Sequence, residues 1–192
     1  MASVHHFPFS DSNYKSTTME YEIEKGVELL ERTPGTLESL LAGLSPDWLT
    51  ADEGPDSWTP WDVMAHLTDL EGSDWLVRVR IILEHGKDRP FDSVDRTAFR
   101  SRLEGRTMES LLEEFAGLRR ENLAALRGMN LGPAEYRLPG THPALGDVVL
   151  SELLSTWVVH DLTHIAQIVR VLAKQYDSAV GPWKEYLGIL KR

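Results

Sequence analysis

Hydrophobic residues recur at intervals of three and four along four long stretches of this chain. That spacing places them on one face of an α-helix. The stretches cover about 17–44, 60–84, 107–127 and 147–176. The first contains Thr33-Pro34, which predicts a kinked or restarted helix. No strand-like alternation of any length is found, so the pattern predicts an all-α protein, a four-helix bundle.

Turn-forming residues separate these stretches. Before the second stretch, Thr59, Pro60 and Asp62 occupy the N-cap, the first helical position and the capping-box position of a helix. Extra short helices are expected at about 95–103 and from Pro182 to Leu190. The segment between the third and fourth helices is rich in Gly and Pro and is expected to be a long loop.

Chain length and composition indicate one globular domain. The chain has 192 residues, of which 42% are hydrophobic and 26% charged, enough for a full hydrophobic core. Residues 1–15 lack helical periodicity, and we expect them to form a flexible arm. Residues 16–192 are then expected to form a single helical-bundle domain.

The charge and the cysteine content exclude several classes of function. The formal net charge is −10, which argues against nucleic acid or an anionic membrane surface as a partner. No apolar run approaches the ~18–20 residues of a membrane span. The chain has no cysteine, and therefore no disulfide, thiolate ligand or cysteine nucleophile. We expect a cytoplasmic protein.

Three histidines are the candidates for a metal centre. His160 and His164 are four residues apart and share one helix face, which is apolar at Leu153 and Ile168. Buried imidazoles need partners, and a divalent metal is the usual partner at this spacing. Pairs of this kind also occur on solvated faces and in cores, so the metal interpretation depends on a third ligand. His66, on the apolar stripe of the second helix, is that candidate.

Several polar or aromatic residues could support such a site. Metal-bound histidines usually donate their second ring N–H to a carboxylate or carbonyl. Asp69 and Gln167 each lie three residues after a histidine, whereas Asp161 is about 100° around the helix from His160 and is expected to meet a different helix. The candidates around the ligands are Asp69, Trp157, Asp161 and Gln167, and the candidate substrate contacts are Arg119, Asn122 and His142.

Other metal and hydrolase chemistries fit the sequence less well. A ferritin-like di-iron bundle needs Glu-x-x-His motifs, which are absent. A zinc protease would have Glu directly after the first histidine, whereas this chain has Asp161. Glu185 could be a downstream ligand, which keeps a protease-like site as a remote alternative. A Gly-x-Ser-x-Gly elbow is also absent.

Two motifs and the tail resemble the DinB-like (DinB/YfiT) metalloprotein superfamily. They are Trp-x-Pro-Trp-Asp-Val-x-x-His-Leu from Trp58, Trp-Val-Val-His-Asp-Leu-x-His-Ile-x-Gln from Trp157, and Val-Gly-Pro-Trp-x-x-Tyr-Leu from Val180. The resemblance implies a four-helix bundle whose three histidines bind one divalent metal, often nickel or zinc, and frequent homodimers. Iron and manganese are further candidates. The superfamily includes thiol transferases and mycothiol-dependent enzymes.

Two reactions are compatible with such a site, and no catalytic residue is assigned. One is thiol transfer, in which a low-molecular-weight thiol attacks an electrophile. The other is hydrolysis of a small molecule, because a metal can lower the pKa of bound water to about 7. The alternative is a non-catalytic protein with a structural or sensor metal site.

Overall fold

The computed structural model describes residues 22–95 and 97–191, so the predicted arm at 1–15 lies outside the described residues. Its α-helices are α1 (Ile23–Leu30), α2 (Thr33–Leu41), α3 (Pro46–Leu49), α4 (Pro60–Ser73), α5 (Trp75–His85), α6 (Phe99–Arg102), α7 (Met108–Gly128) and α8 (Leu150–Lys174). The shorter elements are the 3₁₀ helices η1 (Glu135–Arg137), η2 (Gly181–Tyr186) and η3 (Gly188–Lys191) and the strands β1 (Pro139–His142) and β2 (Gly146–Val149).

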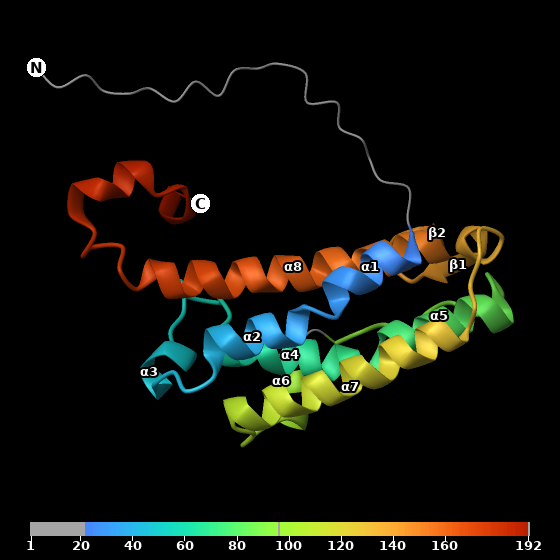
Figure 1. Ribbon diagram of the computed structural model, residues 1–192, viewed down its shortest axis with the longest axis horizontal. Coiled ribbons are helices and arrows are strands. Elements are labelled where there is room, and N and C mark those ends of the chain that lie inside the picture. Colours follow the sequence, from blue (N-terminus) through green and yellow to red (C-terminus); the bar gives the residue numbers. More distant parts are fainter. Residues whose placement is uncertain (1–21, 96, 192) are drawn as a thin grey trace, which may run out of the picture.

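The long helices form the predicted four-helix bundle (Figure 1). One wall is α1 followed by α2, the second is α4 followed by α5, and α7 and α8 are the other two. Helix α4 packs against both α7 and α8, while α1 packs against α8 and α2 against α7. The fourth predicted stretch becomes the single long helix α8, which contributes two of the three candidate histidines.

Two of the predicted helices are interrupted. The first stretch divides into α1 and α2, because Pro34 has no N–H to donate to the carbonyl oxygen of Leu30 four residues earlier. The second stretch, predicted as one helix, divides at Asp74, whose φ of −120° and ψ of −63° depart from helical values. The preceding Gly72 and Ser73 are poor helix formers, which accounts for a break at this point.

The helix starts and the tail follow the sequence signals in part. Thr59 accepts a hydrogen bond from the Asp62 backbone N–H at 3.1 Å, and the Asp62 carboxylate accepts one from the Thr59 backbone N–H at 3.1 Å, which confirms the capping box. The tail forms η2 and η3 in place of one short helix, and Leu190 is its buried residue.

A small hairpin replaces part of the predicted loop between α7 and α8. Strands β1 and β2 are antiparallel, with Pro139 opposite Val149 and His142 opposite Gly146. The sequence gives no sign of these strands, because strands of four residues that contain Pro and Gly are too short to show alternation. The hairpin lies directly before α8 and fixes where that helix begins (Figure 1).

Replacing Gly140 with alanine should destabilise the protein by about 1–3 kcal/mol. A Cβ atom at Gly140 would lie 2.8 Å from the Cγ1 atom of Ile82 and 3.2 Å from Phe91, so the hairpin could no longer pack on α5. Urea unfolding followed by circular dichroism measures this loss. Gly35→Ala is the control, because no atom outside its chain neighbours and its own helix backbone lies within 4 Å of the added Cβ. Equal stability of the two variants would contradict the packing described.

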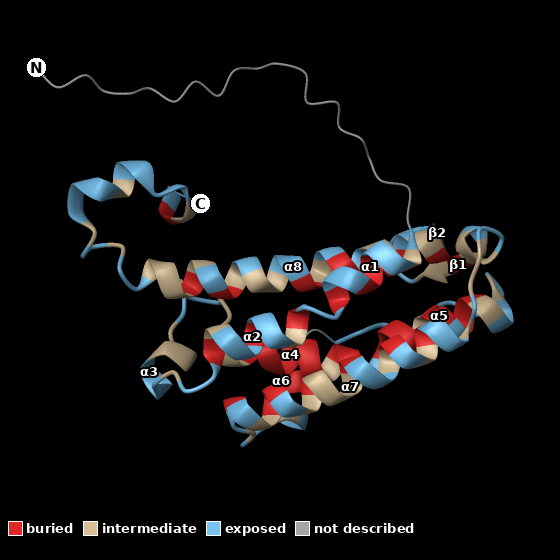
Figure 2. Ribbon diagram, in the orientation of Figure 1, coloured by how far each residue is buried: buried red, intermediate tan, exposed pale blue. Residues whose placement is uncertain are grey.

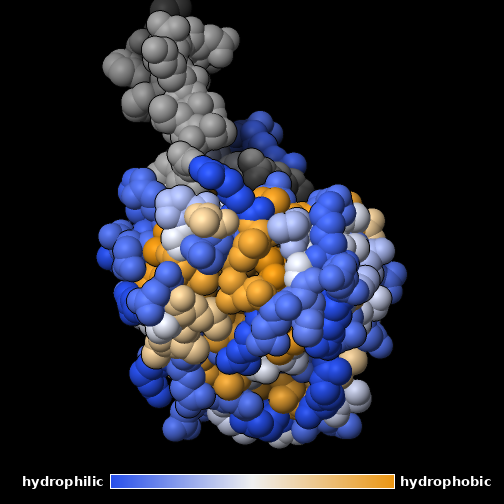
Figure 3. Space-filling view, turned by 90° about the vertical axis from the view of Figure 1, so that its right-hand side faces the viewer, coloured by the Kyte–Doolittle hydropathy of each residue, from blue (hydrophilic) through white to orange (hydrophobic). Residues whose placement is uncertain are grey.

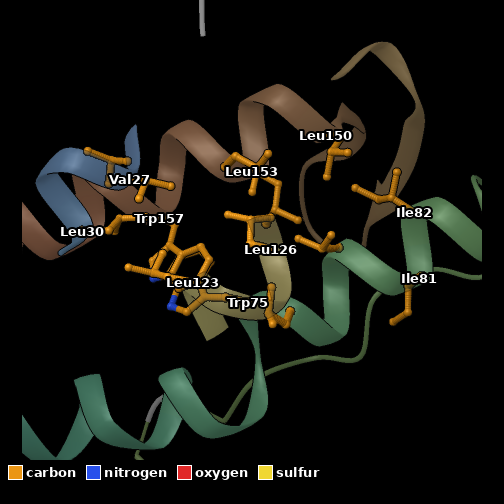
Figure 4. Packing of buried hydrophobic residues seen from close by; sticks show 14 of the residues in the cluster. Val27, Leu30, Trp75, Ile81, Ile82, Leu123, Leu126, Leu150, Leu153 and Trp157 are labelled. Atoms are coloured by element: carbon orange, nitrogen blue, oxygen red, sulfur yellow. The ribbon is translucent and has the colours of Figure 1, made fainter. Parts of the chain in front are cut away.

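Two apolar clusters fill the bundle, and the buried residues face inward (Figure 2). One cluster, around α5 and the first half of α8, brings Trp75 and Trp157 together beside Leu123 and Leu126 (Figure 4). The other cluster lies around α2, α4, the first half of α7 and Ile168. At the hairpin end of the molecule, apolar surface is bordered by hydrophilic residues (Figure 3). None of the helices that the structure describes is long and apolar enough to span a membrane.

Candidate metal centre

Three imidazole rings converge between α4 and α8. His66 comes from α4, and His160 and His164 come from successive turns of α8. The Nε2 atom of His160 lies 3.3 Å from Nε2 of His66 and 3.2 Å from Nε2 of His164. His66 is only 6% exposed, and the other two rings are half-buried. The structure thus brings together the three histidines that the sequence singles out.

The donor atoms fit a divalent metal ion. Metal–imidazole bonds are about 2.0–2.1 Å long, so two nitrogens on one ion at angles between 90° and tetrahedral lie about 2.9–3.4 Å apart. Both separations at His160 fall in that interval. All three candidate ligand atoms lie within 4.8 Å of one another. Three ring nitrogens, with no carboxylate among them, are a donor set suited to zinc, copper, iron or nickel.

The tautomer of His164 is fixed by its neighbour on α8. The Nδ1 atom of His164 lies 2.8 Å from the amide oxygen of Gln167, which can only accept a hydrogen bond. Nδ1 therefore carries the proton, and the lone pair of Nε2 points toward the other histidines. Burial lowers the pKa of His164, although Gln167 and Asp161 partly oppose that effect. Burial therefore favours the neutral ring, which is the state that binds metal.

Replacing Gln167 with leucine should weaken metal binding by about 10–100-fold, the usual effect of removing a partner behind a ligand. The reason is that Nδ1 of His164 loses its acceptor, so neither the tautomer nor the ring orientation is held. Competitive titration against a chromophoric chelator measures the affinity. Gln175→Leu is the control, since Gln175 bonds to backbone carbonyls near the end of α8. Unchanged affinity in Gln167→Leu would show that this contact does not orient the ligand.

Aromatic side chains enclose the three rings. Trp58 stacks on His164 with ring centroids 5.9 Å apart and planes 6° apart, and it meets His66 edge-on at 4.8 Å. Phe99 of α6 contacts His66 at 5.6 Å, and Trp75 of α5 contacts His160 at 5.1 Å. These aromatics were not among the residues predicted to lie around the site. Trp58 begins the first of the two family motifs and could have been assigned to the site from that, whereas Trp75 and Phe99 resemble ordinary core residues in the sequence.

Helix α6 is attached to α4 by two arginine–aspartate pairs. Arg100 binds Asp62 through Nε at 2.8 Å and Nη2 at 3.2 Å, and Arg102 binds Asp69 through Nε at 2.7 Å. These pairs hold Phe99 against His66. Asp69, which the sequence suggested as a partner of His66, is thus engaged with α6.

A buried cluster of charged side chains lies beside the histidines. Arg119 of α7 binds Glu71 of α4 through Nε and Nη2, both at 2.8 Å. It binds Asp161 of α8 through Nη1 at 2.6 Å and Nη2 at 3.2 Å, and Nη1 also donates to the carbonyl oxygen of Leu30 at 2.9 Å. Asn122 donates to Glu71 at 3.0 Å. All five N–H groups of the guanidinium are therefore used, and Glu71 and Asp161 keep the pKa of Arg119 above its usual value despite burial.

The three residues predicted to contact substrate all have protein partners in the structure. Arg119 is 1% exposed and has no remaining donor for a substrate. Asn122 is occupied with the backbone and side chain of Glu71. His142 lies in β1, where its Nδ1 atom accepts hydrogen bonds from the backbone N–H groups of residues 144 and 145. His160 is ten residues into α8 from the hairpin, about 15 Å along the helix, so the structure gives His142 a role in the turn.

The other two predicted neighbours lie where the helix geometry indicates. Asp161 faces α7, away from the histidine face of α8, and Trp157 is fully buried. The indole N–H of Trp157 donates to Glu71 at 3.3 Å. A cleft of about 320 Å³ is lined by side chains that include Asp69, Ser73, Arg78 and Arg102, and none of the three histidines lines it.

The fold and this site define a class of protein: a four-helix bundle with a three-histidine cluster between two of its helices. A family model of the DinB superfamily matches residues 29–168, and the chain belongs to that superfamily. Among solved structures, it is similar to YfiT from Bacillus subtilis, with 20% identity and a TM-score of 0.70 over 88% of this chain and 95% of that one. YfiT is described as a probable metal-dependent hydrolase with an unusual four-helix bundle topology. No curated protein sequence gives a significant match.

Proposed function

We propose that this protein is a metal-dependent hydrolase of a small molecule, with one divalent ion, zinc or nickel, bound by His66, His160 and His164. The convergence of their Nε2 atoms at 3.2 and 3.3 Å carries the proposal. The description of YfiT as a probable metal-dependent hydrolase supports the reaction class.

The side chains around the proposed metal site have different roles. A metal bound by three neutral imidazoles keeps its full positive charge, acts as a Lewis acid and lowers the pKa of a coordinated water or thiol. His66, His160 and His164 hold the ion on rigid helices, and Gln167 keeps one ring in the required tautomer. Trp58 and Phe99 exclude water from one side of the rings, which strengthens electrostatic interactions there.

Thiol transfer is the second candidate. The chain contains no cysteine, so a nucleophilic thiol would have to come from a low-molecular-weight cofactor. The same Lewis acidity that activates water would stabilise a thiolate. A structural or sensor metal would differ from both reactions, because it would bind tightly without turnover. The resemblance to the family also supports a homodimer, which light scattering of the purified protein would test.

One experiment compares the three possibilities. The zinc- and nickel-loaded proteins are assayed with small esters and amides alone, and with small electrophiles plus a low-molecular-weight thiol. Metal-dependent hydrolysis that is lost in His164→Ala supports the proposal. Turnover only with added thiol would replace it with thiol transfer. Tight metal binding without any turnover would favour the structural or sensor role.

A further inference from the structure

Arg119 supplies no metal ligand, yet it is bonded to both helices that do. Glu71 lies on α4 five residues after His66, and Asp161 lies on α8 directly after His160. The guanidinium contacts the two carboxylates through four hydrogen bonds of 2.6–3.2 Å. We propose that Arg119 is a positioning residue of the metal centre, which fixes the rotation of α8 against α4 and so the meeting of its two histidines with His66. This inference rests on the proposed metal site.

The rotation of α8 is strongly defined by these bonds. A guanidinium is planar and its N–H groups point in fixed directions, so both carboxylates must lie in or near one plane. Consecutive residues of a helix are separated by about 100°, so Asp161 faces α7 while His160 faces α4. A turn of α8 that moved the histidines away from His66 would also break the bonds to Asp161. Arg119 and its two partners are each at most 3% exposed, so breaking one of these bonds would leave a buried charge that water does not reach, which is energetically costly.

A second series of contacts connects the charged cluster around Arg119 to His160. Glu71 accepts the indole N–H of Trp157 at 3.3 Å. Trp157 stacks on Trp75 with ring centroids 5.7 Å apart and planes 9° apart, and Trp75 meets the ring of His160 edge-on at 5.1 Å. The ring of His160 is thus supported through α5 as well as through its own helix. His160 is the ligand whose Nε2 atom lies close to both others, so its placement affects the whole site.

The guanidinium of Arg119 also lies between the two apolar clusters. Its central carbon lies 4.8 Å from the ring centre of Phe115 and 5.2 Å from that of Trp157, which belong to different clusters. The carbonyl oxygen of Leu30 is available to Arg119 because Pro34 has no N–H to donate to it. Arg119 therefore holds a defined place among α1, α4, α7 and α8.

The test is Arg119→Lys, which keeps the positive charge but cannot replace a planar group with five N–H donors. Cobalt(II) serves as the probe, because its visible absorption bands report ligand number and geometry as well as binding. We expect cobalt affinity to fall by about 10–100-fold, as for other groups that orient ligands, and the bands of the remaining complex to change. All measurements are made at a temperature where circular dichroism shows each variant to be folded.

Two controls separate positioning from general destabilisation. Arg127→Lys makes the same substitution on the same helix, in a half-exposed pair with Glu31. Leu126→Ala removes a fully buried apolar side chain of α7, so it tests the effect of lowered stability. Both controls should keep the cobalt affinity and absorption bands of the wild type.

The possible results are distinct. An Arg119→Lys variant with lowered stability but unchanged affinity and bands would overturn the positioning role and leave the proposed metal site intact. A wild-type protein that binds no cobalt, zinc or nickel would reject the proposed metal site, and the positioning role with it. Should Arg119→Lys fail to fold, Trp157→Phe decides, because it keeps a six-membered aromatic ring but removes the five-membered ring with the indole N–H that bonds Glu71. A measurable loss of affinity there supports the role, and unchanged affinity overturns it.

Discussion

Replacing His160 with alanine should abolish metal binding while leaving a folded bundle. Removing a group that only orients a ligand costs about 10–100-fold in affinity, and removing the ligand whose Nε2 atom is close to both other nitrogens should cost more. The side chain is half-buried at the edge of the core, so the free energy of unfolding of the metal-free protein should change by no more than about 1 kcal/mol. Isothermal titration with zinc and with nickel, together with urea unfolding of the metal-free forms, measures both effects.

The same variant should lose the stabilisation that metal gives the wild type. A ligand present at 100 times its dissociation constant stabilises the folded state by about 2.7 kcal/mol. Thermal unfolding with and without metal should show this increase for the wild type and none for His160→Ala. The matched control is His85→Ala, which removes a histidine outside the cluster at the end of α5. A His160→Ala variant that still binds metal as tightly as the wild type would contradict the site.

Replacing Arg119 with methionine should destabilise the protein by about 3–5 kcal/mol, as expected when one partner of a buried ion pair is removed. Methionine fills much of the space but leaves the carboxylates of Glu71 and Asp161 buried without the cation that bonds them. Those carboxylate side chains are at most 2% exposed, so water cannot replace the guanidinium without opening the core. Urea unfolding at pH 7 measures the loss.

Arg127→Met provides the comparison for that prediction. Arg127 is on the same helix and is paired with Glu31, but both side chains are nearly half exposed. Surface pairs of this kind contribute about 0–1 kcal/mol. Equal losses in the two variants would show that the buried cluster has no special part in stability.

The sequence was most informative where local spacing determines geometry. His160 and His164 share a helix face because they are four residues apart, and His66 lies on the apolar stripe that must face the bundle interior. The capping box at Thr59 and Asp62 is likewise a local pattern, and it correctly marked the start of α4. The position of Gln167 three residues after His164 was enough to place the two side chains near each other.

Contacts between distant parts of the chain could not be predicted in this way. Arg119 is 48 residues from Glu71 and 42 from Asp161, and nothing in its own neighbourhood marks it as buried. An arginine near an apolar stripe is usually exposed, and only the packed arrangement of α4, α7 and α8 brings both acids to it. The pairing of Asp69 with Arg102 could not be predicted for the same reason, because Arg102 is on the short helix α6. The hairpin was missed because its strands have only four residues each.

The most direct test of the metal centre is the metal content of the protein purified without an affinity tag, measured beside His66→Ala. The comparison is sensitive because both proteins keep His5 and His6 near the N-terminus, so adventitious binding there would be equal in the two. The proposed site predicts about one zinc or nickel ion per chain in the wild type and almost none in the variant. Equal metal contents in the two proteins, or no metal in the wild type even after zinc and nickel are added back, would contradict it.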